Sequence, residues 1–273
     1  MTLPKAKKHW GQNFLVDASM QEKIVKLAHL KGNETVVEIG PGTGALTKRL
    51  CAQAHQVLAY EIDGSLVDSL QFELNVDNLH LIHGDVLKRN LDDDLITLDK
   101  TIEKAILVAN LPYYITTPIL FKVLEQSRLI TTLILMMQDE VALRLTARKA
   151  TKDYNALSVA IQYRTHVHYA FKVPKTVFRP MPQVDSAMLT LEVKDDRLLA
   201  EEDEPFFFDL IKQSFAQRRK TLSNNLVQNY PMDKESLKPF YQERNLPTDV
   251  RAEALSLEDF CALTQYVLRL WPH

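Results

Sequence analysis

The sequence predicts an α/β fold: a mainly parallel sheet with an antiparallel last strand, flanked by helices and followed by a small all-helical domain. Short apolar runs typical of buried strands alternate with helical patterns through the first half of the chain. Two late strands then follow one another without a helix between them, which favours antiparallel pairing. After the acidic stretch 195–205 only helical patterns remain, so we expect two domains, 1–196 and 197–273.

The elements of the first domain follow from local signals. Ser19-Met20-Gln21-Glu22 has the form of a capping box, which predicts a helix start near Ser19, and Gly32 ends that helix. Pro112 cannot extend the preceding strand into a sheet ladder, whereas Pro118 suits the first turn of a helix that begins at Thr116. In order, the expected elements are a helix from about 19, strand 35–39, helix 45–54, strand 57–60, helix 64–74, strands 80–83 and 105–109, a helix from 116, strand 132–137, a helix from 139, and strands 165–173 and 184–193. The segment 157–163 fits either a strand or a helix, and we favour a helix. The second domain is expected to hold helices at 206–215, 219–230, 234–245 and 256–271.

The composition excludes several classes of protein. The chain has 273 residues, of which 46% are hydrophobic and 25% charged, as in an ordinary globular protein. No apolar run reaches the roughly 18 residues of a membrane span, and the lysine-containing N-terminus lacks the apolar region of a secretory signal. Cys51 and Cys261 stand far apart, and no metal-ligand spacing occurs. We therefore expect a cytoplasmic protein with no membrane contact and no metal. We also expect it to be a monomer.

A glycine-rich turn, 40–44, joins the first strand to its helix. Glycines such as Gly40 and Gly42 let the backbone approach a ligand closely, although a purely structural turn is the alternative for such a segment taken alone. The second strand ends at Glu61, roughly 20 residues further on, where a carboxylate can bind both hydroxyls of a ribose. The Gly-x-Gly-x-Gly spacing differs from the dinucleotide fingerprint, which indicates a smaller nucleoside ligand.

Polar residues also follow the third and fourth strands. Asp85 can accept a hydrogen bond from an adenine amino group, and Asn110-Leu111-Pro112-Tyr113 suits a nucleobase whose exocyclic amine must become nucleophilic. The Asn110 side-chain oxygen and the Leu111 carbonyl can accept the two N–H bonds and favour a tetrahedral nitrogen, while Tyr113 offers a flat face for stacking. Each signal alone is also typical of a turn. Four such signals at successive strand ends predict a site, because open α/β sheets bind ligands at that edge.

A stiff, basic loop, 174–182, precedes the last strand and carries Phe178. An aromatic side chain there could form the second wall of a base pocket, and a core-packing role is the alternative.

Basic residues gather in clusters although the net charge is −2. These clusters flank the candidate site loops, so they would give a phosphate-binding surface on one side, although a solvated face is the alternative. They are Lys5, Lys7, Lys8 and His9; Arg144, Arg148, Lys149 and Lys152; Lys172, Lys175 and Arg179; and Arg218, Arg219 and Lys220.

Taken together, these features resemble the ribosomal RNA adenine N6-dimethyltransferase family, and within it the small-subunit (KsgA/RsmA) type. The family has the Rossmann-like sheet of class I S-adenosylmethionine-dependent methyltransferases. Matching segments are 11–15 (Gly-Gln-Asn-Phe-Leu), 38–44 (Glu-Ile-Gly-Pro-Gly-Thr-Gly), 61–63 (Glu-Ile-Asp), 84–85, 110–113, 178–180 (Phe-Arg-Pro), 184–187 and 217–222. Trp10 stands where the family pattern leads us to expect Phe.

The resemblance implies the transfer of four methyl groups from S-adenosylmethionine, two to each of two adjacent adenosines. These adenosines lie in a hairpin loop near the 3′ end of 16S rRNA, and the partner would be the assembling small ribosomal subunit. The cofactor contacts that the resemblance implies are Asn13, Leu15, Gly40, Glu61, Asp85 and Asn110. Residues 110–113 would hold the target amine, and Tyr113 and Phe178 would sandwich a flipped adenine.

Three other functions fit parts of the sequence. A non-catalytic RNA-binding assembly factor with a vestigial cofactor fold is disfavoured by the intact Glu61, Asp85 and Asn110. A 23S rRNA methyltransferase of the antibiotic-resistance type is disfavoured by the small-subunit pattern at 217–222. An NAD-dependent dehydrogenase is disfavoured by the glycine spacing and by the segment 110–113.

Overall fold

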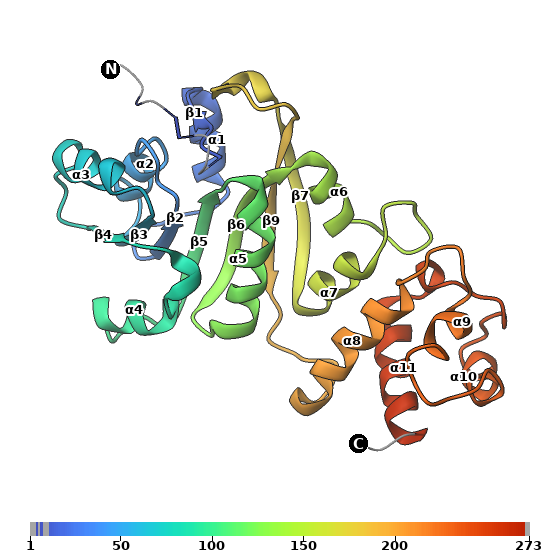
Figure 1. Cartoon of the computed structure of the whole chain (residues 1–273). Coiled ribbons are helices and arrows are strands. Elements are labelled where there is room, and N and C mark those ends of the chain that lie inside the picture. Colours follow the sequence, from blue (N-terminus) through green and yellow to red (C-terminus); the bar gives the residue numbers. More distant parts are fainter. Residues whose placement is uncertain (1–3, 5, 8–10, 271–273) are drawn as a thin grey trace. The chain divides into compact units, whose positions relative to one another are not determined.

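The computed structural model describes Pro4, Ala6, Lys7 and residues 11–270. The chain forms two compact units, one made of Met1–Ala142 and His168–Val193, the other of Leu143–Val167 and Lys194–His273 (Figure 1). The expectations for Lys5, Lys8, His9, Trp10 and Trp271 lie outside the described residues.

A seven-stranded sheet with the order β4-β3-β2-β5-β6-β9-β7 organises the first unit (Figure 1). The strands are β2 (Thr35–Ile39), β3 (Gln56–Glu61), β4 (Leu79–His83), β5 (Ala105–Asn110), β6 (Ile130–Gln138), β7 (Thr165–Val173) and β9 (Ser186–Val193). The first five strands in this order, from β4 to β6, each run parallel to the next. Strand β9 runs antiparallel to β6. The predicted mixed sheet with an antiparallel late strand is therefore confirmed.

The central strands are buried because helices cover a parallel sheet on both faces. Every residue of β2 is buried, and Val36 and Val37 are wholly inaccessible, as is Leu107 of β5. Burying a side chain of this size contributes about 1.5–3 kcal/mol relative to leaving it exposed. These strands therefore form a rigid base for the residues at their carboxyl ends.

The helices of the first unit connect these strands. They are α1 (Ala18–Lys26), α2 (Thr47–Cys51), α3 (Gly64–Glu73), α4 (Leu91–Leu98), α5 (Tyr113–Gln126) and α6 (Asp139–Leu145), with 3-10 turns η2 (Val86–Lys88) and η3 (Lys175–Val177). A separate two-stranded ribbon pairs β1 (Phe14–Leu15) with β8 (Phe178–Arg179).

Several local expectations need correction. Helix α1 ends at Lys26, before the Gly32 that was expected to end it, and the expected helix 219–230 is helical only over Leu222–Leu226. The cap of α1 is Asp17, whose carboxylate accepts the Met20 N–H and the Ser19 hydroxyl, so Ser19 is not the capping residue. Helix α5 begins directly after Pro112, which leaves Pro118 inside the helix instead of in its first turn. Helix α4 was not expected, although Asn90 caps it and three aspartates occupy its first turn.

The second unit is helical, with α7 (Ala156–Arg164), η4 (Glu201–Asp203), α8 (Glu204–Ser214), α9 (Leu222–Leu226), η5 (Glu235–Leu237), α10 (Lys238–Glu243), η6 (Ala252–Ala254) and α11 (Leu257–Leu270). Glu204, which is buried, accepts hydrogen bonds from Tyr163, Arg164 and Arg197. Segment 143–167, which the sequence-based division assigns to the first domain, is thus tied to the C-terminal helices. No helix formed by the described residues has the length and apolar character needed to cross a membrane.

Candidate active site

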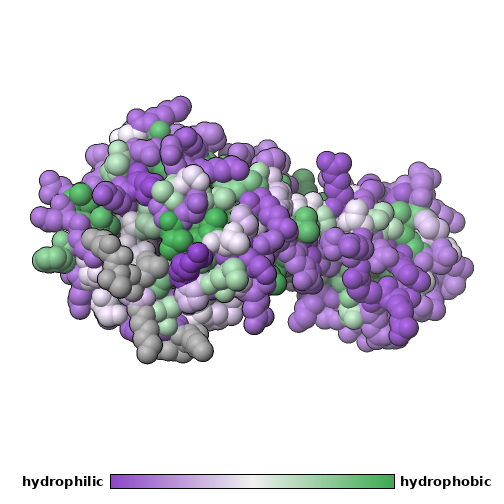
Figure 2. Space-filling view, turned by 90° about the horizontal axis from the view of Figure 1, so that it is seen from above, coloured by the Kyte–Doolittle hydropathy of each residue, from purple (hydrophilic) through white to green (hydrophobic). Residues whose placement is uncertain are grey.

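A cavity of about 320 Å³ lies at the carboxyl ends of the central strands. The structure brings every sequence-predicted site residue to its wall: Asn13, Leu15, Gly40, Gly42, Glu61, Asp85, Asn110, Leu111, Pro112, Tyr113 and Phe178. Figure 2 shows apolar surface gathered within the first unit and bordered by hydrophilic side chains. Such a mixed wall suits a ligand with a flat apolar part and a few polar groups.

The glycine-rich turn after β2 forms one wall of the cavity. Gly40 and Gly42 have φ values of 72° and 59°, in the left-handed region that favours glycine. A Cβ on Gly40 would lie 3.6 Å from the Leu111 side chain, and one on Gly42 would lie 3.5 Å from the Phe14 ring. The missing side chains leave a cradle between the turn and its neighbours, as close backbone contact with a nucleoside requires.

Glu61 presents a carboxylate from the end of β3. Its Oε2 accepts the Gly42 N–H and its Oε1 accepts the Asp63 N–H, each over 3.0 Å. The side chain is buried, and this burial raises the pKa of Glu61. Each carboxylate oxygen keeps acceptor capacity toward the cavity, so Glu61 fits a ligand that offers two hydroxyl groups.

Two further acceptors stand along the same edge of the sheet. Asp85 accepts the Leu87 N–H over 3.0 Å and thereby caps η2, which leaves its second oxygen for another donor. Asn110 ends β5 half-buried, and its carboxamide has no hydrogen-bond partner among the described residues. Both side chains are therefore able to receive the polar groups of a ligand.

Tyr113 begins α5 directly beside Asn110. Its hydroxyl lies 2.9 Å from Oγ of Ser186, the first residue of β9. The ring lines the cavity and is half-buried. An aromatic face and a carboxamide that has no hydrogen-bond partner among the described residues thus line the same cavity, as a positioned nucleobase amine would need.

The β1–β8 ribbon joins two parts of the cavity wall that are distant in sequence. Leu15 pairs with Phe178, and the Val16 N–H donates to the Val177 carbonyl over 2.9 Å. Phe178 is only 2% exposed, so a ligand can reach its ring only from within the cavity. The ribbon therefore links Leu15, on the predicted cofactor side of the cavity, to Phe178, on the predicted base side.

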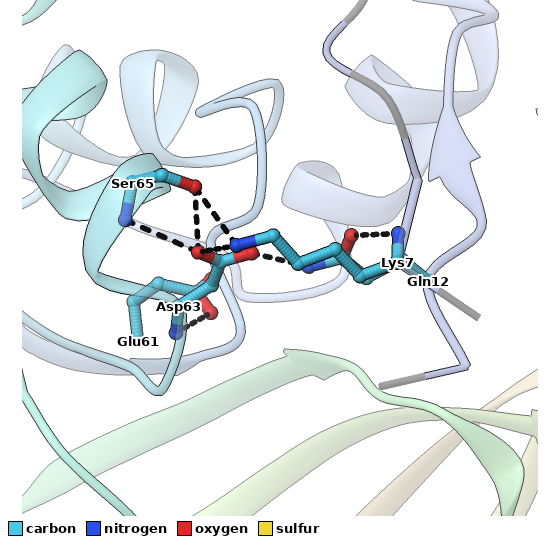
Figure 3. Close-up of polar contacts among 5 residues, drawn as sticks. All are labelled: Lys7, Gln12, Glu61, Asp63 and Ser65. Atoms are coloured by element: carbon cyan, nitrogen blue, oxygen red, sulfur yellow. Dashed lines mark hydrogen bonds and ion pairs between the residues drawn. The ribbon is translucent and has the colours of Figure 1, made fainter. Parts of the chain in front are cut away.

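A polar cluster ties the N-terminal segment to the loop after β3 (Figure 3). Asp63 Oδ1 accepts Lys7 Nζ over 2.6 Å, and its Oδ2 accepts Gln12 Nε2 over 3.1 Å. The Ser65 hydroxyl adds another bond to Asp63 over 2.6 Å. Burial alone would raise the pKa of Asp63, but bonds from Lys7, Ser65 and Gln12 outweigh it and hold the pKa at about 2. Asp63 is consequently ionised above about pH 3 and pins the segment that carries Asn13.

We expect Asp63→Asn to weaken S-adenosylmethionine binding by roughly three-fold to ten-fold, because losing a charge-assisted bond costs about 1 kcal/mol at a partly exposed partner. Lys7 is the partly exposed partner, with 40% of its side chain accessible. Calorimetry should measure the affinity, and limited proteolysis before Phe14 should become faster. Glu22→Gln, which removes the same charge from the exposed pair with Lys26, is the matched control. Equal S-adenosylmethionine affinities for the two variants would show that the Asp63 cluster does not support the cavity wall.

Sequence reasoning missed several residues at this cavity. Glu38 lines it with 2% exposure, and its Oε2 has no hydrogen-bond partner among the described residues. Burial, with the nearby Glu61 carboxylate, raises the pKa of Glu38 to about 8, so its side chain is largely neutral at pH 7. Ser186 also lines the cavity, and Lys7 and Asp63 support its wall from outside. Their contacts span long sequence separations, so no local spacing predicts these roles.

Two of the predicted basic clusters meet within the second unit. Arg218 donates to the Lys152 carbonyl over 2.7 Å, which brings the turn at 217–220 beside the loop at 148–152. Arg148, Lys149 and Arg219 are exposed there. In the first unit, by contrast, Lys172 forms ion pairs with Asp139 and Asp185. These two carboxylates offset its charge, so Lys172 is less suited to bind a phosphate.

Comparison with known proteins identifies the family of this chain. The family model for ribosomal RNA adenine dimethylase matches residues 3–268. Ribosomal RNA small subunit methyltransferase A of Bacillus cytotoxicus is 44% identical over 98% of this chain and 92% of its own length. The protein of the same name from Bacillus licheniformis is 42% identical over 94% and 90% of the two chains.

Solved structures show the same fold. A dimethyladenosine transferase from Plasmodium falciparum superposes with a TM-score of 0.74 and 26% identity, over 94% of this chain and 97% of its own. The 23S rRNA methyltransferase ErmE gives a TM-score of 0.72 and 26% identity, over 93% and 99% of the two chains. Given this agreement in sequence and fold, the chain belongs to the ribosomal RNA adenine dimethylase family, whose members are S-adenosylmethionine-dependent methyltransferases.

Proposed function

We propose that this chain transfers methyl groups from S-adenosylmethionine to N6 of two adjacent adenosines in the hairpin loop near the 3′ end of 16S rRNA. Each adenosine would receive two methyl groups during assembly of the small ribosomal subunit. The observation that carries the proposal is the convergence of Glu61, Asn110 and Tyr113 on one cavity. Relatives named for the small subunit are 42–44% identical to this chain, which favours that target over the 23S target of the less similar ErmE.

The donor side of the cavity fits S-adenosylmethionine. Glu61 would accept the ribose hydroxyls, Asp85 the adenine amino group, and the turn at Gly40 and Gly42 would admit the donor close to the backbone. Asn13 and Leu15 would cover it from the N-terminal segment. When bound, S-adenosylmethionine supplies a methyl group that is already activated on a sulfonium sulfur.

The acceptor side would hold the target adenine. Tyr113 and Phe178 would stack on the base, with Asn110 Oδ1 and the Leu111 carbonyl accepting its two N–H bonds. Pro112 fixes the turn between these groups. No general base is needed before attack, because the amine proton becomes acidic only after the new bond has formed. The residues therefore act by position and alignment.

The direct test is a labelled methyl-transfer assay on small subunits that lack the modification, with the modified nucleotides mapped. We expect dimethyladenosine at two neighbouring positions of the hairpin loop. Label in large-subunit rRNA, or no label in any ribosomal adenine, would contradict the proposal. Action as a cytoplasmic monomer is part of the same proposal, as is rRNA recognition by the helical C-terminal domain, 197–273.

We expect the double variant Arg218→Met/Lys220→Met to bind small subunits more weakly and with a flatter salt dependence. Each lost phosphate contact should reduce the slope of log K against log salt by about 0.7–0.9. Filter binding between low and moderate salt measures that slope. The control is Lys100→Met/Lys104→Met, which removes two exposed charges before β5, at the opposite end of the strand from the cavity. This double variant should leave the salt slope unchanged. Identical slopes for both double variants would exclude these phosphate contacts.

A further inference from the structure

The hydrogen bond between Tyr113 and Ser186 joins the acceptor side of the cavity to the antiparallel strand. The two hydroxyl oxygens lie 2.9 Å apart, across 73 residues of sequence. Ser186 is wholly inaccessible to solvent, and it lines the cavity together with Tyr113. A ring held at Cβ and again at its hydroxyl cannot swing its long axis out of the cavity, so this bond helps to define where a stacked base lies.

Ser186 itself is held from several directions. It pairs with Gln138 at the end of the β6–β9 ladder. The preceding residue, Asp185, accepts the Asp139 N–H at its carbonyl over 3.1 Å and the Lys175 N–H at Oδ1 over 3.0 Å. The backbone at Ser186 is therefore held in place, so its hydroxyl offers a defined anchor for the Tyr113 ring.

The Tyr113 phenol is able to make this bond at neutral pH. Burial, together with the nearby Asp185 carboxylate, raises the pKa of Tyr113, so the hydroxyl keeps its proton. Either oxygen can then donate. No other hydrogen bond of the Tyr113 hydroxyl occurs within the described residues, so Ser186 alone anchors it.

The two methyl transfers to one adenine make different demands on this anchor. In each transfer the N6 lone pair forms the new N–C bond as the S–C bond breaks, the bonding pair stays on sulfur, and the amine proton is then released to water. Before the first transfer, N6 offers two N–H bonds to Asn110 and Leu111. Before the second transfer only one N–H remains, so stacking on Tyr113 must supply more of the alignment.

We infer that Ser186 is a positioning residue that acts through Tyr113 and supports the second methyl transfer more than the first. The inference rests on the proposed function, since it concerns the two steps of adenine dimethylation. Loss of the anchor should therefore change the product ratio as well as the rate.

The test compares Ser186→Ala with the wild-type enzyme on unmethylated small subunits, following N6-methyladenosine and N6,N6-dimethyladenosine over time. We expect the second rate constant to fall about ten-fold and the first about two-fold to three-fold, the range that corresponds to losing one hydrogen bond. Monomethylated adenosine should accumulate, while KM for the subunit stays unchanged. A smaller fraction of folded enzyme would lower both rate constants equally and leave their ratio unchanged.

Tyr113→Phe provides a second, independent variant, because it removes only the hydroxyl from a half-buried ring. It should reproduce the change in product ratio, and Ser186→Ala/Tyr113→Phe should be no worse than either single variant. Ser214→Ala is the control: that serine is also wholly buried and donates to the Leu210 carbonyl in the second unit.

Two outcomes would overturn the inference: a wild-type product ratio in both Ser186→Ala and Tyr113→Phe, or additive losses in the double variant. Failure of the proposed function looks different, because the wild-type enzyme would then yield neither methylated adenosine from small subunits.

Discussion

Asn110→Ala is expected to reduce methyl transfer at least about a hundred-fold, the scale seen when one preorganised polar group is removed from an active site. The variant loses the oxygen that would accept an N–H of the target amine and hold the nitrogen in a tetrahedral shape. Because Asn110 is half-buried and makes no hydrogen bond to another described residue, its removal leaves no partner unsatisfied. Thermal unfolding should therefore change little.

Single-turnover transfer to unmethylated small subunits measures this loss. Asn229→Ala, at an exposed asparagine of the helical unit, is the matched control and should keep the full rate. An Asn110→Ala enzyme as fast as the wild type would rule out the role assigned to Asn110 in holding the target amine. The same variant separates catalysis from binding, since a non-catalytic assembly factor would support subunit assembly as well without Asn110.

Glu61→Gln is expected to weaken S-adenosylmethionine binding by about ten-fold to one-hundred-fold, because hydrogen bonds to a charged group contribute about 1.5–3 kcal/mol. The substitution keeps the shape of the side chain, removes its charge and replaces one acceptor oxygen with an N–H donor. Calorimetry gives the affinity directly, and Glu61→Ala should be at least as weak. Glu73→Gln, an exposed position on α3, has the same change of charge and should bind normally.

The same interaction predicts a pH dependence. Burial raises the pKa of Glu61 above its ordinary 4.5, so the carboxylate takes up a proton at a higher pH than a free glutamate would. A protonated carboxyl group offers one acceptor fewer to the ribose, so affinity should fall as the pH is lowered toward and through this raised value. Glu61→Gln should show no such fall. A wild-type affinity that stays constant down to pH 4.5 would contradict the role assigned to Glu61.

Local sequence signals predicted the strands and their polar ends well. The apolar runs before Gly40, Glu61 and Asn110 are fixed by burial between two layers of helices, which makes such strands recognisable from their apolar character and the turn residues that follow them. The edge strand before Asp85 is only half-buried, and it was recognised from the same signals. Helix boundaries were predicted less well. Helix α4 was not predicted because its three consecutive aspartates are also typical of a solvated loop. Asn90, which precedes them, is a recognisable N-cap.

Long-range contacts explain what local patterns could not predict. The bonds from Lys7 to Asp63 and from Tyr113 to Ser186 span 56 and 73 residues. Neither involves a spacing that marks a helix, a strand or a turn. The assignment of segment 143–167 to the second unit has the same cause, because it depends on Glu204 meeting Tyr163 and Arg164.

The position of β9 between β6 and β7 also determines the order in which the nascent chain can fold. A ribosome releases the polypeptide from its N-terminus, so β2 to β6 can pair as they emerge. Strand β7 emerges before β9 but has β9 as its neighbour in the sheet, so it must wait for that later strand. The catalytic unit is thus completed only after Val193 has left the exit tunnel, when most of the chain has already been synthesised.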